Sequence, residues 1–218
     1  MFKEIPGLLS KAQIEALHAI ARRSTFRDGR MTNPANKAKN NLQAYDSEAA
    51  EILSSALMAH EDFRNFAFPV RIAPPILTRY DAGMGYGWHA DAAFLETGAG
   101  PIRGDLSCTV FLSDPATYTG GALTIRLGER ELAFRGGAGS AIVYPSHSFH
   151  QVQPVAAGAR LVGLTFIQSR VASAHHREIL YELNEIAALE GLKMSFENFS
   201  RLQLVRRNLL HLWGDAPR

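Results

Sequence analysis

Apolar residues near both ends of the chain recur every three or four positions, which is the spacing of an amphipathic α-helix. The first of these segments begins at Ser10-Lys11-Ala12-Gln13, whose serine and glutamine side chains can satisfy free backbone donors as a capping box. The first predicted helix begins at Ser10. Three further helices are predicted at about residues 47–58, 174–191 and 196–213. Between the first two lies a polar segment, residues 26–43, which includes Asn33-Pro34 and is expected to be loop with some extended chain.

Between residues 74 and 169 the pattern changes to short apolar runs that are rich in β-branched residues. Turn-forming pairs such as Gly120-Gly121 and Gly136-Gly137 separate these runs, at a spacing of roughly 8–12 residues. The predicted strands span residues 76–80, 106–112, 122–125, 131–134, 140–144, 149–152 and 161–168. Because no helical pattern lies between them, they indicate an antiparallel sandwich or barrel rather than a parallel sheet with crossover helices.

The two patterns together predict an α+β fold. We expect residues 1–170 to form one domain, with N-terminal helices and a β core at about residues 74–170. Residues 171–218 are expected to form a C-terminal helical extension. The chain of 218 residues is long enough for a sizeable core, and its 46% hydrophobic and 20% charged residues are typical of a soluble globular protein.

Three further features of the sequence indicate which partners and which cellular location to expect. They are the charge balance, the cysteine content and the N-terminus. The net charge is only +2, so no nucleic-acid partner is expected from long-range electrostatics. Cys108 is the single cysteine and lies in an apolar run, which indicates a buried small side chain rather than a nucleophile. No run approaches the roughly 20 apolar residues of a membrane span, and the N-terminus lacks the apolar core of a signal peptide, so we expect a cytoplasmic protein.

The segment from Tyr80 to Asp91 reads YDAGMGYGWHAD and allows two interpretations, a phosphate-binding loop or the approach to a metal site. A dinucleotide fingerprint needs the spacing G-x-G-x-x-G between a strand and a helix, because the helix N-terminus binds the pyrophosphate. Here the spacing is G-x-G-x-G, no helix of adequate length follows, and a Walker lysine is missing. The glycines therefore indicate a lead into a strand, and the metal interpretation is favoured.

His89 and Asp91 are the residues on which the metal interpretation rests. In an extended strand, residues i and i+2 point to the same face, so an imidazole and a carboxylate would aim at one point. A third ligand must come from a distant strand. Several histidines are expected in helices or at a helix start, namely His18, His60, His175, His176 and His211. Of the other two, His150 is preferred because it lies in the next extended run, whereas His147 lies in the preceding turn.

Two histidines and one carboxylate form the facial triad of non-haem iron enzymes, although zinc accepts the same ligands. A cosubstrate site near the metal would distinguish an iron oxygenase from a zinc protein, and Arg160 is the candidate residue for such a site. Arg160 follows His150 by ten residues, across the turn at Ala157-Gly158, so a hairpin would return it beside the strand of His150. An arginine inside a β core needs an anion, such as the far carboxylate of 2-oxoglutarate. The alternative is an arginine at the hairpin edge in solvent.

Longer segments of the chain carry a family resemblance. They are KNNLQ (39–43), LTRYDAGMGYGWHAD (77–91), DLSCTVFLSDPATYTGGAL (105–123), YPSHSFHQVQPVAAGARL (144–161) and FIQS (166–169). With these segments the chain resembles, nearly end to end, the PKHD-type hydroxylases, bacterial relatives of the prolyl 4-hydroxylases among the iron(II)/2-oxoglutarate-dependent dioxygenases. Residues 122–134 look shorter than the hairpin usual in that family, which could border the active-site mouth and affect the substrate range.

The resemblance implies a double-stranded β-helix, or jelly roll, with N-terminal and C-terminal helices packed against it. It implies iron(II) held by the catalytic residues His89, Asp91 and His150, and 2-oxoglutarate held at its far carboxylate by Arg160. It also implies that the Tyr80 hydroxyl helps to hold 2-oxoglutarate, with a core tyrosine as the alternative. Dioxygen is the implied second cosubstrate and L-ascorbate the implied reductant. The expected reaction hydroxylates an unactivated C–H bond and decarboxylates 2-oxoglutarate to succinate.

Other function classes remain as alternatives. A nucleic-acid demethylase would carry a second arginine a few residues after the first, but the next arginine after Arg160 is Arg170. A non-catalytic metal-binding or sensing cupin-like protein would keep the metal ligands without a need for Arg160. A zinc hydrolase would need a general base near the metal-bound water, and no acidic residue is an obvious candidate.

The substrate stays open between a free amino acid, a peptide, a protein side chain and a small metabolite. Arg79, Trp88 and Arg103 flank the presumed mouth, where packing or solvation is the expected role of each. No membrane partner is expected, and the apolar C-terminal helices could serve a homodimer.

Overall fold

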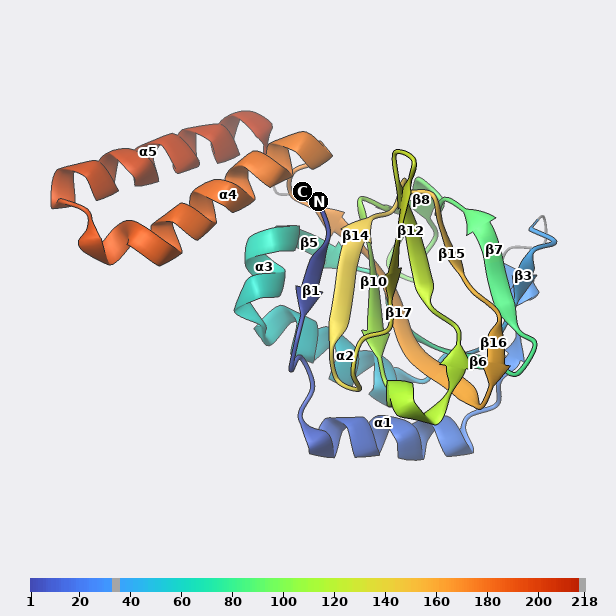
Figure 1. The fold of residues 1–218 in the computed structure, drawn as a ribbon. Coiled ribbons are helices and arrows are strands. Elements are labelled where there is room, and N and C mark those ends of the chain that lie inside the picture. The colour runs from blue at the N-terminus through green and yellow to red at the C-terminus, as the bar shows by residue number, and fades with distance from the viewer. Residues whose placement is uncertain (33–35, 216–218) are drawn as a thin grey trace.

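The computed structural model describes residues 1–32 and 36–215, so the predicted loop at Asn33-Pro34 lies outside the described residues. Two β-sheets face each other, helices lie along the outside of the larger sheet, and two C-terminal helices extend away from the sheets (Figure 1). The helices of the described residues are α1 (Lys11–Arg23), α2 (Ser47–Ala59), α3 (Glu61–Ala67), α4 (Ala174–Glu190) and α5 (Phe196–Trp213). Short 3-10 turns lie at Gly29–Thr32, Pro115–Thr117 and Gly191–Lys193.

The larger sheet has eight strands in the described part of the chain. Its order is β1 (Lys3–Ile5), β14 (Ala141–Pro145), β10 (Leu106–Phe111), β17 (Ala159–Ser169), β6 (Ile76–Asp81), β4 (Leu42–Ala44) and β2 (Arg27–Asp28). The eighth strand, β5 (Pro69–Ile72), pairs with the C-terminal end of β17. Each pairing described here is antiparallel, so the apolar runs of the sequence meet side by side as an antiparallel sheet requires.

The smaller sheet lies opposite. Its order is β13 (Arg130–Phe134), β12 (Leu123–Leu127), β15 (His150–Val152), β7 (Gly85–His89) and β3 (Lys39–Asn40). Two short pairs complete the strands, β8 (Phe94–Leu95) with β9 (Ile102–Arg103) and β11 (Thr119–Gly120) with β16 (Val155–Ala157). From β6 to β17 the chain crosses repeatedly between the two main sheets, which is the arrangement of a jelly roll. The predicted α+β fold with a jelly-roll core is confirmed.

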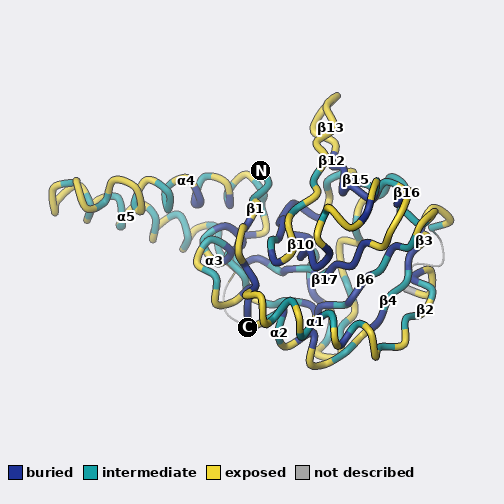
Figure 2. Tube along the Cα trace, turned by 60° about the horizontal axis from the view of Figure 1, so that its bottom comes forward, coloured by how far each residue is buried: buried dark blue, intermediate teal, exposed yellow. Residues whose placement is uncertain are grey.

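Alternate residues of the larger sheet serve two different cores. On β10, Cys108 and Val110 face the helices, where they join an apolar cluster with Leu17 and Leu53. Phe111, one position out of phase, joins a second cluster between the two sheets. Every residue of β10 is buried for this reason, and Figure 2 shows the central strands as the most buried part of the molecule. The helices therefore cover one face of the sheet and leave the other to line the interior.

The predicted helices form with nearly the predicted bounds. The Ser10 hydroxyl accepts from the Gln13 backbone N–H at 3.3 Å, and the Gln13 carbonyl oxygen Oε1 accepts from the Ser10 N–H at 2.9 Å, so the capping box is confirmed. One helix was not predicted. It is α3, whose seven residues from Glu61 are too short to show helical periodicity, and which is held by the buried side chains of Phe63 and Phe66.

The glycine segment differs from its prediction. It is not a lead into a strand but the strand itself, because β7 begins at Gly85 and ends at His89. A Cβ at Gly85 would lie 3.0 Å from the carbonyl oxygen of Val152, and one at Gly87 would lie 2.8 Å from the Cβ of Ala38. The missing side chains let the neighbouring chain segments approach β7 closely, which periodicity alone does not reveal.

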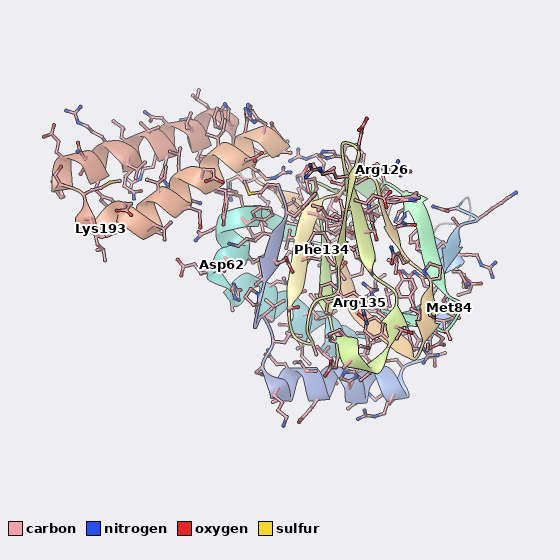
Figure 3. All side chains as sticks on the ribbon, in the orientation of Figure 1. Asp62, Met84, Arg126, Phe134, Arg135 and Lys193 are labelled. Atoms are coloured by element: carbon pink, nitrogen blue, oxygen red, sulfur yellow. The ribbon has the colours of Figure 1, made fainter. Side chains whose placement is uncertain are left out.

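The C-terminal helices form a hairpin whose contacts with the rest of the molecule, within the described residues, lie mainly on α4 and reach as far as Asn184, whose side-chain amide donates to the carbonyl oxygen of Asn65 at 3.3 Å. Leu180 and Tyr181 of α4 are buried, and the Tyr181 ring packs edge-on against Phe66 at 5.4 Å. In contrast, α5 has no buried residue among those described. Lys193, between the two helices, lies at the end far from the sheets (Figure 3). The predicted packing of the C-terminal helices is thus concentrated in the first part of α4.

Transmembrane segments were searched for among the described residues. None of their helices combines the length and the apolar character needed to cross a membrane.

Cys108 provides a test of the buried core. Its side chain is fully buried on β10, and burial raises the pKa of its thiol to about 12. We therefore expect no reaction with a thiol-specific reagent at pH 8 while the protein is folded, and complete reaction in concentrated guanidinium, because the thiolate is the reactive form. Folded protein that reacts as fast as free cysteine would show that β10 is not packed as described.

Candidate metal centre and its cavity

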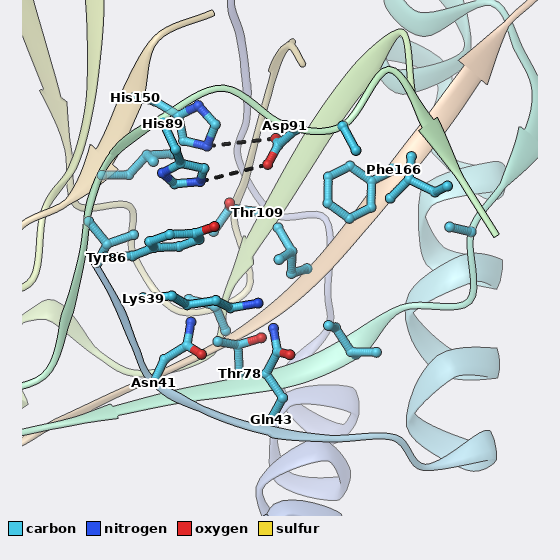
Figure 4. A pocket seen from close by; sticks show the side chains of 18 of the residues that line it. Lys39, Asn41, Gln43, Thr78, Tyr86, His89, Asp91, Thr109, His150 and Phe166 are labelled. Atoms are coloured by element: carbon cyan, nitrogen blue, oxygen red, sulfur yellow. Dashed lines mark ion pairs between the residues drawn. The ribbon is translucent and has the colours of Figure 1, made fainter. Parts of the chain in front are cut away.

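Strand pairing brings the two predicted histidine ligands together. His89 is the last residue of β7, His150 is the first residue of β15, and the two are direct partners in the antiparallel pairing of these strands. Asp91 completes the group, with its Oδ1 3.7 Å from the His89 Nε2 and its Oδ2 3.6 Å from the His150 Nε2 (Figure 4). Within the described residues, these three form the group of His, Cys, Asp or Glu side chains that could hold a metal ion.

Asp91 reaches this position in a way that the sequence did not predict. The strand ends at His89, so Asp91 lies in irregular chain rather than two residues along an extended strand. Its backbone N–H donates to the carbonyl oxygen of Ser146 at 3.0 Å, and its Oδ2 accepts from the hydroxyl of Ser107 at 2.5 Å. Ser107 also contacts the Ser146 hydroxyl at 2.9 Å. These two serines orient the carboxylate, and no motif in the sequence identified them.

Both imidazole rings are held in the tautomer that a metal requires. The Nδ1 of His89 lies 2.8 Å from the carbonyl oxygen of Gly87, and the Nδ1 of His150 lies 2.8 Å from that of Ser148. Because a carbonyl oxygen can only accept, each Nδ1 carries the hydrogen and each Nε2 presents its lone pair towards Asp91. The ring of Tyr86 stacks on the His89 ring at 3.6 Å and further restricts its orientation.

The electrostatic surroundings also fit a bound cation. Burial lowers the pKa of His89 to about 4, with the nearby His150 as the next contribution, so His89 is neutral at pH 7. Burial raises the pKa of Asp91, while His150 and the Ser107 hydrogen bond act in the opposite direction. Two imidazoles and a buried carboxylate are a donor set suited to a divalent cation such as iron(II) or zinc(II).

A cavity of about 790 Å³ adjoins these ligands, between the two sheets. Arg160 lies in its wall, on β17 opposite Tyr80 of β6, and is only 1% exposed. Its Nε and Nη2 atoms have no hydrogen-bond partner, and its guanidinium carbon lies 5.2 Å from the Tyr80 ring centroid. Arg160 therefore faces the interior and not solvent. Buried N–H donors on a cation without a partner indicate a place for an anion.

Tyr80 lies beside Arg160 in the same wall. Its hydroxyl accepts from the Asn41 side-chain amide at 3.0 Å, which leaves its own O–H free to donate to a ligand. Burial raises the pKa of the Tyr80 phenol, so it stays protonated at neutral pH. Sequence reasoning missed several polar neighbours in this cavity, namely Lys39, Asn41, Gln43 and Thr78. Lys39, Asn41 and Gln43 lie in the segment KNNLQ, which shows no periodicity that would place it against a site, and Thr78 lies in the predicted strand 76–80 without a feature that marks it.

The remaining sequence candidates lie outside the cavity. His147 is exposed in the turn before β15, so His150 is the histidine that joins the group. Three flanking residues have packing roles, as expected: Arg79 pairs with Asp81, Trp88 stacks on Phe149 beneath Arg126, and Arg103 pairs with Asp105 and Asp215. Of the β12–β13 hairpin, Leu123 is the residue that lines the described cavity, and the tip of the hairpin projects away from the sheets (Figure 1).

A jelly roll with this group of ligands is the arrangement expected of the 2-oxoglutarate and iron(II) oxygenases, and comparisons with known proteins identify that class. Residues 75–168 match the family described as the 2OG-Fe(II) oxygenase superfamily. A prolyl-4-hydroxylase of Pseudomonas putida has a similar fold, with a TM-score of 0.59 and 20% identity over 78% of this chain and 92% of its own. A prolyl hydroxylase of Trichoplax adhaerens gives a TM-score of 0.60 and 15% identity over 77% of this chain and 83% of its own.

Relatives that match the whole chain narrow the class. A PKHD-type hydroxylase of Sphingopyxis alaskensis is 51% identical over 98% of this chain and 99% of its own length. One from Shewanella sp. strain MR-4 is 35% identical over 99% of this chain and 100% of its own. The chain belongs to the PKHD-type hydroxylase family and is a dioxygenase, which confirms the resemblance found in the sequence.

The Ser107 contact predicts an effect on metal affinity. Replacement Ser107→Ala removes the hydrogen bond that orients the Asp91 carboxylate. We expect manganese(II), used as a redox-stable probe, to bind about 10–100-fold more weakly, which is the usual effect of losing such a supporting contact. Isothermal titration calorimetry measures this, with Ser140→Ala as the control, because the Ser140 hydroxyl bonds to Gly137 in a remote turn. An unchanged affinity in Ser107→Ala would contradict the proposed support.

Proposed function

We propose that His89, Asp91 and His150 hold iron(II) and that the protein hydroxylates an unactivated C–H bond while it decarboxylates 2-oxoglutarate to succinate. When bound, the iron would supply the electron-transfer chemistry that dioxygen requires. The protein's own residues have three tasks in this proposal. The backbone carbonyls of Gly87 and Ser148 fix the tautomers, Ser107 orients Asp91, and the sheets exclude bulk water.

The observation that carries this proposal is the buried guanidinium of Arg160 in the same cavity as the ligand group. We propose that it binds the far carboxylate of 2-oxoglutarate and that the Tyr80 hydroxyl donates to the same molecule. A non-catalytic cupin-like protein would gain nothing from a buried cation whose Nε and Nη2 lack hydrogen-bond partners. A zinc hydrolase is disfavoured as well, because the carboxylate other than Asp91 among the described lining residues is Glu96, which is exposed.

The substrate class can be bounded by the neighbours of the fold. The Trichoplax adhaerens structure holds a peptide fragment, and another neighbour, HygX from Streptomyces hygroscopicus, was solved with nickel, 2-oxoglutarate and hygromycin B bound. For this chain we propose a small molecule, a peptide or a protein side chain as substrate. We also propose L-ascorbate as the reductant, a cytoplasmic location, and a division into a catalytic domain (1–170) and a helical extension (171–218).

A pair of variants tests the assignment of ligands and cosubstrate. Anaerobic addition of iron(II) and 2-oxoglutarate to the wild-type protein should give a weak visible charge-transfer band, and air should then give succinate. His89→Ala should lose both, because it removes a metal ligand. Arg160→Ala should keep the band but raise the Kd for 2-oxoglutarate by about 30-fold or more, since a buried charge loses its partner.

The control for these variants is Arg126→Ala, an arginine on the outer side of β12 that stacks on Trp88 and does not line the cavity. Full turnover by His89→Ala under iron(II) would refute the ligand assignment. An unchanged requirement for 2-oxoglutarate in Arg160→Ala would refute the cosubstrate assignment.

The C-terminal hairpin supports a second proposal, that two copies of the chain associate through it. Its helices expose large apolar side chains, which are Ile186, Leu189, Leu192, Phe196, Leu204, Val205 and Leu212. Exposed charges differ in part between the helices, with Glu178 and Glu182 on α4 against Arg207 on α5, where Arg201 is already paired with Glu197. A two-fold dimer could place α4 of one copy against α5 of the other, so that both the apolar surfaces and the opposite charges meet.

Light scattering after size exclusion tests this association. The wild-type protein should be a dimer at tens of micromolar, and the double variant Leu189→Glu with Leu204→Glu should be a monomer, because two charges would then lie within the apolar contact. Leu127→Glu, at an exposed position on β12, is the matched control and should stay dimeric. A monomeric wild-type protein would exclude this role for the hairpin.

A further inference from the structure

The wall of the cavity on the larger sheet changes in polarity along its strands. Because alternate residues of a strand share a face, β17 lines the cavity with Arg160, Val162, Leu164 and Phe166. The partners on β6 that also line the cavity are Tyr80, Thr78 and Ile76, opposite the first three in that order. The wall is therefore polar around Arg160 and apolar from Leu164 onwards.

The apolar stretch of this wall lies beside the metal ligands. Phe166 is the direct partner of Ser107 on β10, and Ser107 donates to the Asp91 carboxylate at 2.5 Å. Figure 4 shows Phe166 on the side of Asp91, across the cavity from Tyr86. Leu164 follows Arg160 by four residues on β17, which is about 13 Å of extended strand. The five-carbon chain of 2-oxoglutarate is too short to fill both places, so the apolar stretch is available for the molecule that is hydroxylated.

The β8–β9 hairpin forms the rim of the cavity at the same stretch. Its position follows from Arg103 of β9, which donates to the carbonyl oxygen of Ser169 at the C-terminal end of β17, at 3.1 Å. Phe94 and Leu95 of β8 line the cavity, and Phe94 is 69% exposed. A large apolar side chain exposed at a cavity rim indicates a contact with a ligand. We call the following residues the apolar end of the cavity: Ile76, Phe94, Leu95, Leu164 and Phe166.

The hairpin is held in place by contacts outside the cavity. The Arg71 guanidinium on β5 donates to the carbonyl oxygens of residues 99–101, at 2.8 to 3.2 Å. The Ile102 side chain of β9 is buried. Phe94 is thus presented by an element that is already ordered, so a ligand does not have to meet the cost of ordering it.

The polar lining residues near the apolar end already have hydrogen-bond partners. The Thr97 hydroxyl donates to the carbonyl oxygen of Gly100 at 2.6 Å. The Thr109 side chain, beside Leu164 in the sheet, is hydrogen-bonded to Tyr144. This end therefore presents mainly apolar surface to a ligand.

The charges in the cavity also favour an uncharged group at this end. The cationic side chains among the described lining residues are Lys39 and Arg160, and the carboxylates are Asp91 and Glu96. With a divalent ion and doubly negative 2-oxoglutarate, these charges balance. A charged group at the apolar end would upset the balance and would lose its hydration without a partner.

We propose that the apolar end binds an uncharged apolar group of the substrate and that Phe94 determines which groups fit. This assignment rests on the proposed function, because it takes the ligand group and Arg160 as the places of iron and 2-oxoglutarate. The group can be an alkyl chain of a small molecule or an apolar side chain of a peptide, and both present the same surface. Its burial positions the substrate beside Asp91.

The test uses two substitutions at the apolar end, each with a matched control. Phe94→Ser is compared with Phe196→Ser, an exposed phenylalanine on α5 that does not line the cavity. Ile76→Thr keeps a β-branched side chain in β6 and is compared with Val70→Thr, at an exposed position on β5. Because Phe94 and Val70 are exposed and both threonines suit a strand, the variants are expected to fold.

Binding is measured by ligand-observed NMR on protein loaded with zinc(II) and 2-oxoglutarate, with uncharged N-alkylacetamides as probes. From N-propyl to N-hexylacetamide the affinity of the wild type and of both controls should rise about tenfold or more, because each methylene leaves water. Phe94→Ser and Ile76→Thr should each bind the hexyl probe at least about threefold more weakly. An affinity that does not rise with chain length in the wild type, or that is unchanged in both variants, would overturn the inference.

Two further probes define the group that is bound. N-acetyl-norleucine amide carries a butyl chain on a peptide unit, and its affinity relative to N-butylacetamide distinguishes a peptide from a small molecule as the source. Either order supports the apolar end as the binding place. Tighter binding of hexyltrimethylammonium than of N-hexylacetamide would instead indicate a cation site at Phe94 and Glu96 and would overturn the inference.

A last measurement distinguishes this inference from the proposed function. The Kd for 2-oxoglutarate, from the anaerobic iron(II) band, should change less than about twofold in Phe94→Ser, because Phe94 does not hold the cosubstrate. A Kd raised as in Arg160→Ala would place 2-oxoglutarate at the apolar end and overturn the inference. Absence of the band from the wild type would refute the proposed function itself, whereas the alkyl series tests the apolar end independently.

Discussion

The antiparallel pairing of β7 with β15 is the constraint on which the site depends. It makes His89 and His150 direct partners across two strands that lie far apart in the sequence. Each ring is then held by a backbone carbonyl two residues earlier in its own chain segment, at Gly87 and at Ser148. A shift of one residue in this pairing would turn one ring to the opposite face of the sheet, so the register of the sheet sets the geometry of the ligand group.

The jelly roll separates stability from chemistry on the two faces of the larger sheet. Positions such as Cys108 and Val110 on β10 pack against α1 and α2, and contribute to the apolar cluster outside the cavity. Thr109, between them, lines the cavity instead. The same alternation on β17 directs Leu161 to the helices and Arg160 to the interior. A rigid, well-packed outer layer thus holds a polar inner surface in place.

Much of this arrangement could be predicted from local patterns. The helices α1, α2, α4 and α5 and the apolar strands follow from periodicity, and the choice of His150 over His147 follows from its place in an extended run. The strand β7 could not be predicted, because its glycines are explained only by the close approach of Ala38 and Val152.

The residues that surround and orient the ligand group could not be predicted from the sequence either. Ser107 and Lys39 reach it through pairing with strands distant in sequence, which leaves no local signal. The position of Asp91 likewise depends on its contact with Ser146 rather than on strand geometry. Spacing thus predicted which three side chains the fold brings together, while the contacts that orient them belong to the assembled fold.

The buried guanidinium of Arg160 has a consequence for how a ligand would be selected. Folding has already removed the guanidinium from water. The aromatic rings of Tyr80 and Phe111 flank it, and its Nε and Nη2 have no hydrogen-bond partners. An arriving anion needs to lose only its own hydration, whereas a neutral molecule of the same shape would leave the cation uncompensated. If Arg160 binds an anion as proposed, this arrangement would discriminate against uncharged analogues before any reaction begins, because the empty site already presents the complementary charge.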